Sequence, residues 1–379
     1  MQFLKNKKVL ILSPQGWGKM RISKHHYALQ LAAQGNEVCF VNPPVEGLDG
    51  ERSTWEDGVQ IVSYPTPAFY KLKFHWAALY KRLMSWYIHR VLKAIQFAPD
   101  VVLSFDLGGD YPLGAFPDCL KLFFPVDEPQ SEIARTAGES ADLILSVTHE
   151  ILGFYNHRAA PKVFLNHGVD EMFLQQESFR ATAAEDENAI RIGYAGNLMR
   201  PDIDRPMMRE IIRSNPSIMF ELWGTYDRQT SNLGVGSKGE KAESFIVFLE
   251  AQENVVMHGP VAPRELVKGF SRMNGFLICY DIEKDQSSGT NYHKILEYLA
   301  TGKVVISNNV TTYNDMPLFR MCNSRSNNDE MPLLFKDTIE QLGEWNSEER
   351  CRQRIEFAAA HTYGKQLEKI DESIMRLPS

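Results

Sequence analysis

The segment SSGTNYHKILEYLATGKVVISNN, residues 287–309, joins small polar residues to a run with helical spacing. A helix over Thr290–Ala300 would place its polar side chains on one side, at about 100° per residue, and its apolar side chains on the other. The polar side chains are Thr290, His293, Lys294 and Glu297. A helix N-terminus offers free N–H groups and a partial positive charge, which suit a phosphate. We therefore expect phosphate to bind here, with Ser287, Ser288 and Gly289 letting the backbone come close and Lys294 adding a charge.

Glu297 lies one turn deeper in the same predicted helix. Its carboxylate only accepts hydrogen bonds, so it could receive both hydroxyl protons of a ribose. Phosphate at the helix tip and a diol beside the carboxylate describe a nucleoside diphosphate. The alternative is that Lys294 and Glu297 form an ordinary i,i+3 ion pair on a solvated face.

The composition limits what kind of protein could carry such a site. The 379 residues suggest two domains, and the 44% apolar content suits large buried cores. The net charge of −7 and the pI near 5.9 give no reason to expect nucleic acid as a partner. The scattered cysteines predict reduced thiols in a cytoplasmic protein without a disulfide framework or a zinc site. They are Cys39, Cys119, Cys279, Cys322 and Cys351. The apolar run near the N-terminus is too short for a signal peptide, and no apolar stretch is long enough to span a bilayer.

Strands and helices alternate along the chain, twice over. Continuous apolar strands such as KKVLILSP, DVVLSFD and ADLILSV alternate with helical spacing, which predicts parallel sheets covered on both faces. The pattern restarts at AIRIGYAGNL and continues through IMFELWG, ENVVMHGPV, GFLICYD and KVVISNN. We place a linker at Gln175–Asn188 and a mobile loop at Ser231–Glu243. The fold class expected is α/β, with two doubly wound Rossmann-like domains and a cleft between the carboxyl ends of their strands.

The expected domain ranges follow from this restart. The N-terminal domain covers residues 1–178, and the C-terminal domain covers residues 186–360. The last helix, about residues 362–379, is expected to pack back on the N-terminal domain.

The turn after the first strand, SPQGWGKMR, has Gly16-x-Gly18 but Arg21 where the dinucleotide fingerprint needs its third glycine. No P-loop pattern occurs, so neither a dehydrogenase nor a P-loop protein is favoured. The turn is either a plain βα turn or an acceptor-side loop of Gly16, Trp17 and Gly18 that lets substrate approach the backbone.

These stretches together resemble the GT-B glycosyltransferases of bacterial surface-polysaccharide synthesis. HKILEYLATGKVVISN is similar to their K-x-x-E-Y-L-A-x-G-x-P-V-V signature. ADLILSVTHEILGFYN and APKVFLNHGVDEMF resemble their inter-domain passage, and IRIGYAGNL and ENVVMHGPV two strands of their nucleotide-sugar domain. The likeness covers nearly the whole chain in order. It implies a nucleotide-sugar site at Gly196, Asn197, Arg200, Gly259, Ser288, Gly289, Thr290, His293, Lys294 and Glu297.

The chain also departs from the large retaining family with this pattern. That family has a second glutamate eight positions before the one in the helix, where this chain has Gly289. Its arginine and lysine after the G-x-L loop have only Arg200 as an imperfect counterpart. The chain looks closer to the inverting branch that includes the xanthan glucuronosyltransferase.

An inverting transfer needs a base that removes the acceptor's hydroxyl proton. The strand in CLKLFFPVDEPQ delivers Asp127 and Glu128 to its carboxyl end, where α/β sites collect. Asp127 is the predicted base. It could instead cap the next helix, and Asp106 is the rival base. His25 is predicted to be a helix-surface residue.

Tyr70 to Lys93 carries six cations and no acid, interleaved with Trp76, Tyr80, Trp86 and Tyr87. Such a helix suits a membrane interface with anionic lipid. The alternative is a core-packing helix with a solvated basic face.

The sequence therefore predicts a glycosyltransferase with no cofactor and no metal, which moves a sugar from a nucleotide-diphospho-sugar, expected to be UDP-based. The acceptor would be lipid-linked or an oligosaccharide in cell-surface polysaccharide synthesis, and the enzyme cytoplasmic at the inner face of the plasma membrane. A nucleotide-sugar epimerase of the same fold and a catalytically silent partner subunit are the alternatives.

Overall fold

The computed structural model describes residues 3–18, 21–116, 118–175, 189–226, 240–285 and 291–377, with no side-chain detail for residues 240 and 241. The chain divides into two compact units. The first comprises Met1–Gly168 with Tyr363–Ser379, and the second Val169–Thr362. Most of the predicted linker and residues 231–239 of the predicted mobile loop lie outside the described residues.

The first unit is built on an eight-stranded sheet in the order β3-β4-β2-β1-β5-β6-β7-β8. All neighbours pair in parallel except β3 and β4, which form an antiparallel edge. The strands are β1 (Lys8–Leu12), β2 (Glu37–Val41), β3 (Arg52–Glu56), β4 (Val59–Ser63), β5 (Val101–Ser104), β6 (Leu120–Phe123), β7 (Leu143–Ser146) and β8 (Lys162–Phe164).

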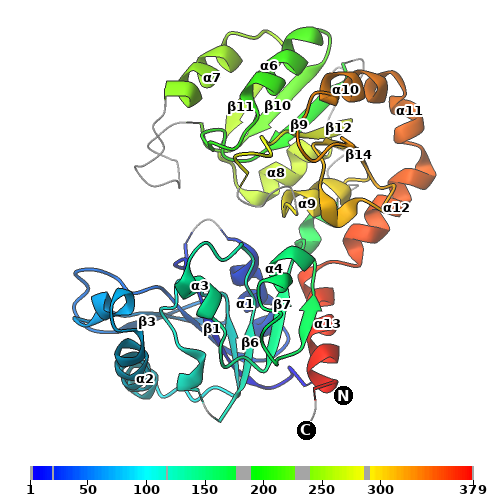
Figure 1. The fold of residues 1–379 in the computed structure, drawn as a ribbon. Coiled ribbons are helices and arrows are strands. Elements are labelled where there is room, and N and C mark those ends of the chain that lie inside the picture. The colour runs from blue at the N-terminus through cyan, green and yellow to red at the C-terminus, as the bar shows by residue number, and fades with distance from the viewer. Residues whose placement is uncertain are drawn as a thin grey trace. The chain divides into compact units, whose positions relative to one another are not determined.

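Helices connect these strands and cover the sheet. They are α1 (Ser23–Ala33), η1 (Tyr70–Phe74), α2 (Ala77–Ala94), η2 (Leu113–Ala115), α3 (Glu132–Thr136), α4 (His149–Gly153) and the last helix α13 (Tyr363–Met375). Figure 1 shows α13, in red, returning to the first unit. It packs on α1, and the Gln366 amide donates to the carbonyls of Asn166 (2.8 Å) and His167 (2.7 Å). This contact matches the expected return of the C-terminal helix.

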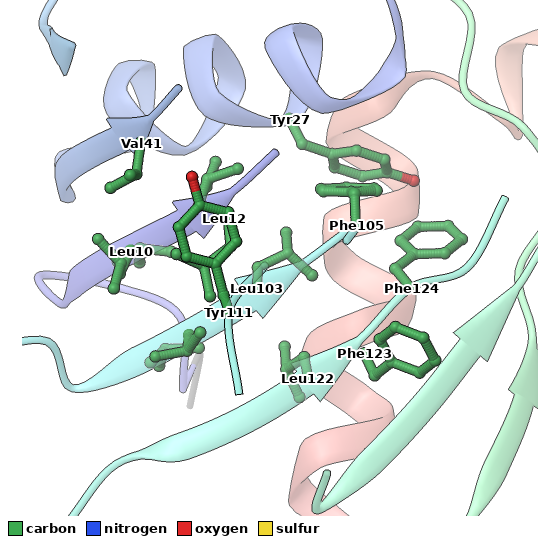
Figure 2. Close-up of a cluster of buried hydrophobic side chains, with 14 of the residues drawn as sticks. Leu10, Leu12, Tyr27, Val41, Leu103, Phe105, Tyr111, Leu122, Phe123 and Phe124 are labelled. Carbon is green, nitrogen blue, oxygen red and sulfur yellow. The ribbon is translucent and has the colours of Figure 1, made fainter. Parts of the chain in front are cut away.

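The core of the first unit is a single apolar cluster in which the four central strands meet α1 (Figure 2). Strands β1 and β5 are buried along almost their whole length, so their side chains are apolar on both faces of the sheet. At their carboxyl ends, Tyr27 of α1 lies against Phe105 and Phe124, whose rings stack with centroids 5.3 Å apart. This aromatic group forms a rigid base beneath the turns that carry the polar side chains described below.

The second unit has a six-stranded, fully parallel sheet in the order β11-β10-β9-β12-β13-β14. Its strands are β9 (Arg191–Ala195), β10 (Met219–Trp223), β11 (Val255–Gly259), β12 (Gly275–Ile278), β13 (Val304–Ser307) and β14 (Arg320–Met321). Its helices are η3 (Glu171–Leu174), α6 (Arg205–Ser214), α7 (Glu240–Glu250), α8 (Pro263–Phe270), α9 (Lys294–Leu299), η4 (Thr311–Tyr313), α10 (Met331–Glu340), α11 (Leu342–Trp345) and α12 (Glu348–Ala359).

Both faces of this second sheet are covered. Phe220 and Leu222 of β10 point into a cluster with α6, α7 and α10, whereas their neighbour Trp223 points into a cluster with α8, α9 and α12. Figure 1 shows α6 and α7 on one side of the strands and α8 and α9 on the other. The predicted α/β class with two doubly wound units is confirmed.

Two local predictions were wrong, and one strand was not predicted. Helix α9 begins at Lys294, with Asn291 and Tyr292 outside it, so the described part of the chain does not support a helix from Thr290. Helix α7 begins at Glu240, inside the predicted mobile loop. The strand that was not predicted is β3, whose five residues are all exposed, so it lacks the continuous apolar run of the central strands.

Candidate functional site

Three turns at the carboxyl ends of neighbouring strands lie side by side in the second unit. The Gly196 N–H donates to the Trp223 carbonyl at 2.9 Å, and the Gly224 N–H donates to the Gly259 carbonyl at 2.8 Å. Gly224 has φ +124°, and a Cβ built there would lie 2.0 Å from the Gly196 oxygen. Only glycine fits such a position. The turns after β9, β10 and β11 therefore form one rigid edge that includes the predicted site residues Gly196 and Gly259.

Helix α9 is fixed against the same edge. The hydroxyl of Tyr298, which is buried, accepts the N–H of Ala195 at 2.8 Å. Ala195 directly precedes Gly196, so this hydrogen bond ties Tyr298 to the start of the first glycine turn. Glu297 is the residue next to Tyr298 in the helix. The structure thus brings Gly196, Asn197 and Glu297 to adjoining elements. Asn197 holds its own turn, because its side-chain oxygen accepts the Met199 N–H at 2.9 Å.

Lys294 and Glu297 form an ion pair, with Nζ and Oε2 2.9 Å apart. The prediction that these residues form an ion pair is therefore confirmed. The prediction that the pair lies on a solvated face is wrong, since the two side chains are only 23% and 17% exposed. His293 is the exposed residue that precedes the helix, and its side chain makes no capping hydrogen bond to it. Because α9 has six residues, the phosphate role drawn from a longer helix loses its main support. Ser288, Gly289 and Thr290 lie outside the described residues.

The charge of Arg200, another predicted site residue, is paired with a carboxylate. Its guanidinium binds the buried carboxylate of Asp202, with Nε 2.8 Å from Oδ1, and lies over the Tyr280 ring at 5.6 Å. The bond to Asp202 raises the pKa of Arg200, so the side chain stays charged. Any phosphate that it bound would share it with Asp202.

The glycine turn of the first unit is open. The backbone N–H of Trp17 donates to Asn42 Oδ1 at 2.8 Å, and the indole ring of Trp17 packs edge-on against Phe40. Neither Gly16 nor Gly18 has a positive φ, and a Cβ at Gly18 would meet nothing within 4 Å. Packing and backbone geometry therefore do not require these two glycines, in contrast to Gly224.

His25 is buried rather than on the helix surface, so that prediction was wrong. Its Nδ1 accepts the Ile22 N–H at 3.0 Å, and its Nε2 lies 3.2 Å from the Gly16 carbonyl. The first contact requires an unprotonated Nδ1, so Nε2 carries the proton and donates it. Burial lowers the pKa of His25 to about 4, which keeps it neutral. His25 therefore stabilises the Gly16 turn through its hydrogen bond to the Gly16 carbonyl.

Asp127 follows β6 and is exposed. It does not cap α3, because Ser131 does so by accepting the Ala134 N–H at 3.1 Å. The capping alternative is therefore wrong. Asp127 sits in an arrangement that the sequence did not reveal, since the buried Lys24 at the start of α1 interacts with its charge.

Lys24, a buried cation beside the glycine turn, was not singled out in the sequence analysis. Its Nζ donates to Gln15 Oε1 of the glycine turn at 2.5 Å. Burial lowers its pKa to about 8, partly offset by Asp127 and Asp106. Its place at the start of a helix, directly after a glycine turn, was the available signal.

Asp106, the rival base, is buried within the turn that follows β5. Its carboxylate accepts the N–H groups of Gly108 (2.8 Å) and Tyr111 (2.9 Å). Burial, with the neighbouring Asp110 carboxylate, raises its pKa. Both carboxylate oxygens accept backbone N–H groups, so Asp106 stabilises its own turn. It is therefore the poorer candidate for contacting a substrate.

The basic aromatic segment is half core and half surface. Tyr80 and Tyr87, predicted as interfacial anchors, are 2% and 6% exposed and pack into the sheet, whereas Trp76 and Trp86 are 65% and 63% exposed. Lys73 is buried too, with Nζ 2.6 Å from Asp110 Oδ1. The segment therefore packs one side into the core, as the alternative predicted, and leaves Trp76 and Trp86 exposed on the other side.

Among the described residues, no group of three or more His, Cys, Asp or Glu side chains is placed to hold a metal ion. Within the same ranges, none of the helices could serve as a transmembrane segment.

Comparisons with known proteins find the fold but no close relative. No family model matches the chain, and no curated protein sequence matches it. Sucrose-phosphate synthase from Thermosynechococcus elongatus is similar in structure, with a TM-score of 0.70 and 11% identity over 98% of this chain and 99% of that one. A trehalose-6-phosphate synthase studied for glycosyl transfer with retention has a TM-score of 0.67 and 10% identity over 98% and 99%. The Anabaena protein HepE, solved in complex with UDP and glucose, has a TM-score of 0.63 and 12% identity over 98% and 100%. The chain has the GT-B fold of these glycosyltransferases.

Proposed function

We propose that the protein is a glycosyltransferase that moves a sugar from a nucleotide-diphospho-sugar, a UDP-sugar, to an acceptor hydroxyl. The observation that carries this proposal is the carboxyl edge of the second sheet. Tyr298 there fixes Glu297 beside the Gly196 turn, on a fold whose solved examples include a complex with UDP. The Glu297 carboxylate, which is 17% exposed, would accept the ribose hydroxyls.

The chemistry of transfer would divide between the units. The second unit would hold the donor, with Lys294 drawn from Glu297 toward the diphosphate as charge develops on it. The first unit would hold the acceptor at the open Gly16–Gly18 turn, and Asp127 would remove the hydroxyl proton. The inverting outcome rests on Asp127 as that base and on Gly289 standing where a retaining family has glutamate.

For the acceptor we propose a lipid-linked or oligosaccharide chain of cell-surface polysaccharide synthesis. The support is the segment Tyr70 to Lys93, where Trp76, Trp86 and several cations remain exposed. Exposed indoles among cations favour the interface of an anionic membrane. The enzyme would then work as a peripheral protein on the cytoplasmic face.

Nucleotide binding tests the donor half of this proposal. Thermal unfolding is measured with UDP, UDP-sugars and other nucleoside diphosphates, since a ligand that binds the folded state raises the midpoint by mass action. We expect the UDP series to stabilise the protein and Glu297→Ala to abolish the shift. No shift with any nucleotide would contradict the donor site and leave the silent partner subunit as the better account.

Incubation with donor alone distinguishes transfer from epimerisation. An epimerase converts the donor without an acceptor, whereas a transferase releases the nucleotide at a useful rate only when an acceptor is present. The stereochemistry of the product then tests the inverting assignment, and a retained anomeric configuration would overturn the base role of Asp127.

A further inference from the structure

The first unit contains a cavity of about 250 Å³ that the proposed transfer chemistry does not use. It lies between α2, the 109–114 turn and the segment 133–140, all within that unit. Its size is near the lower end of about 300–1,000 Å³ for drug-sized ligands, so it suits a small group rather than a whole substrate.

The charged side chains that line this cavity are mostly basic. Three basic side chains reach it, Lys73, Lys81 and Arg82, against the single carboxylate of Glu139. Lys73 is committed to the buried Asp110. Lys81 pairs with Glu139 at 2.7 Å, and Arg82 is exposed, with no ion pair among the described residues. Ser85 and Ser140 also line it, and the Ser85 hydroxyl donates to the Lys81 carbonyl at 2.7 Å.

The Lys81–Glu139 pair can open at little cost. Both side chains are about half exposed, at 45% and 54%, and such pairs contribute about 0–1 kcal/mol. Glu139 also lies 3.9 Å from Arg158, so it keeps a cation if Lys81 turns toward a ligand. Lys81 and Arg82 are therefore both available to an anion in the cavity.

Helix α2, which lines the cavity, also carries exposed apolar side chains. On α2, Leu79, Arg82, Trp86 and Lys93 fall within an arc of about 60°, so Arg82 belongs both to the cavity wall and to this stripe. Leu79 and Trp86 are 40% and 63% exposed. A bound anion at Arg82 would thus have the apolar side chains of Leu79 and Trp86 beside it on the helix.

We propose that this cavity binds the phosphate of a membrane lipid, with Lys81 and Arg82 as its ligands and the acyl chains lying along Leu79 and Trp86. The proposal concerns lipid binding and stands whether or not the protein transfers a sugar. It adds a specific phosphate site to the diffuse attraction of a basic helix for anionic lipid.

The test measures flotation of the full chain with phosphatidylcholine vesicles doped with phosphatidate or, at equal surface potential, with oleate. Lys81→Gln/Arg82→Gln removes two cations from the cavity. Lys71→Gln/Lys93→Gln is the matched control, since it removes two exposed cations outside the cavity and leaves Lys73 with Asp110. We expect the cavity variant to bind phosphatidate vesicles at least tenfold more weakly than the control, and the two variants to bind oleate vesicles equally. Equal losses on phosphatidate would overturn the proposal in favour of diffuse attraction.

A second variant removes space instead of charge. Ala77 lines the cavity and is exposed, so Ala77→Gln adds bulk without disturbing the core. We expect it to lose the preference for phosphatidate, and an unchanged preference would contradict the site.

Soluble dihexanoyl phosphatidate should displace the wild-type protein from vesicles, whereas inorganic phosphate should not. Equal displacement by inorganic phosphate would assign the cavity to free phosphate and overturn the lipid assignment. Thermal unfolding of each variant confirms that it is folded.

Discussion

Two side chains three residues apart, Lys294 and Glu297, have separable roles in the account. Glu297→Gln should weaken both uridine and UDP by about ten- to a hundredfold, because a charged acceptor of two hydroxyls is worth about 1.5–3 kcal/mol. Lys294→Met should weaken UDP while leaving uridine unchanged, since only the diphosphate would use its charge. Titration calorimetry with both ligands measures this. If the pair is merely structural, both variants lose stability and neither changes uridine affinity.

Asp127 and Asp106 are two carboxylates with different environments, and substitution by asparagine separates them. Asp127→Asn should lower kcat by about 10²–10⁴-fold and leave UDP affinity intact, because a base contributes only to turnover. Asp106→Asn should instead lower stability by about 1–3 kcal/mol, since an amide turned toward the Gly108 and Tyr111 N–H groups can leave a buried donor unpaired. A stable, inactive Asp106→Asn beside an active Asp127→Asn would reverse the two roles.

Lys24 gives a pH dependence whose sign follows from its lowered pKa. In the folded protein Lys24 loses its proton near pH 8, whereas the unfolded chain keeps it to about pH 10.5. Between these values the unfolded state binds more protons, so the free energy of unfolding rises with pH through Lys24. Urea titrations of wild type and Lys24→Met should therefore differ by an amount that changes by up to about 3 kcal/mol over this window. Parallel curves would place Lys24 in solvent.

At the scale of elements, the C-terminal helix α13 is part of the first unit although 194 residues of the second unit, Val169–Thr362, precede it in sequence. Gln366 is fully buried and donates to two carbonyls, so Gln366→Ala should cost about 2–4 kcal/mol through lost bonds and an unfilled space. Lys365→Ala is the matched control on the exposed side and should change stability by less than about 0.5 kcal/mol. Urea denaturation compares them, and equal effects would contradict the docking of this helix.

The order of elements could be predicted because each central strand is a continuous apolar run and each helix has its own period. The return of α13 was expected, and its apolar residues Leu367, Ile370 and Ile374 are in the core of the first unit. What failed was local. Helix α9 is shorter than its pattern, since polar residues before Lys294 fit a helix N-terminus or a turn equally well. The burial of Tyr80 and Tyr87 could not be separated from the exposure of Trp76 and Trp86 by residue type, because aromatic side chains serve both core and interface.

Site residues were harder to predict than elements for a physical reason. The spacing of Lys294 and Glu297 predicted their contact, since residues three apart on a helix are neighbours. Lys24 and Asp127 are 103 positions apart, and their charges interact because β1, β5 and β6 are neighbours in the sheet, which a one-dimensional pattern does not contain. The glycine contact between positions 196 and 224 likewise depends on β9 and β10 being neighbours.

For the whole molecule, the account requires a donor and an acceptor to be consumed together. The measurement is nucleotide release from a panel of UDP-sugars, followed with and without a membrane lipid and oligosaccharide extract as acceptor, for the wild type, Asp127→Asn and Glu297→Gln. The account predicts release that depends on the extract, with a labelled sugar appearing in the acceptor fraction, and near-complete loss in Asp127→Asn. Release by no donor in the panel, or conversion of the donor without any acceptor, would contradict glycosyl transfer as the function of this protein.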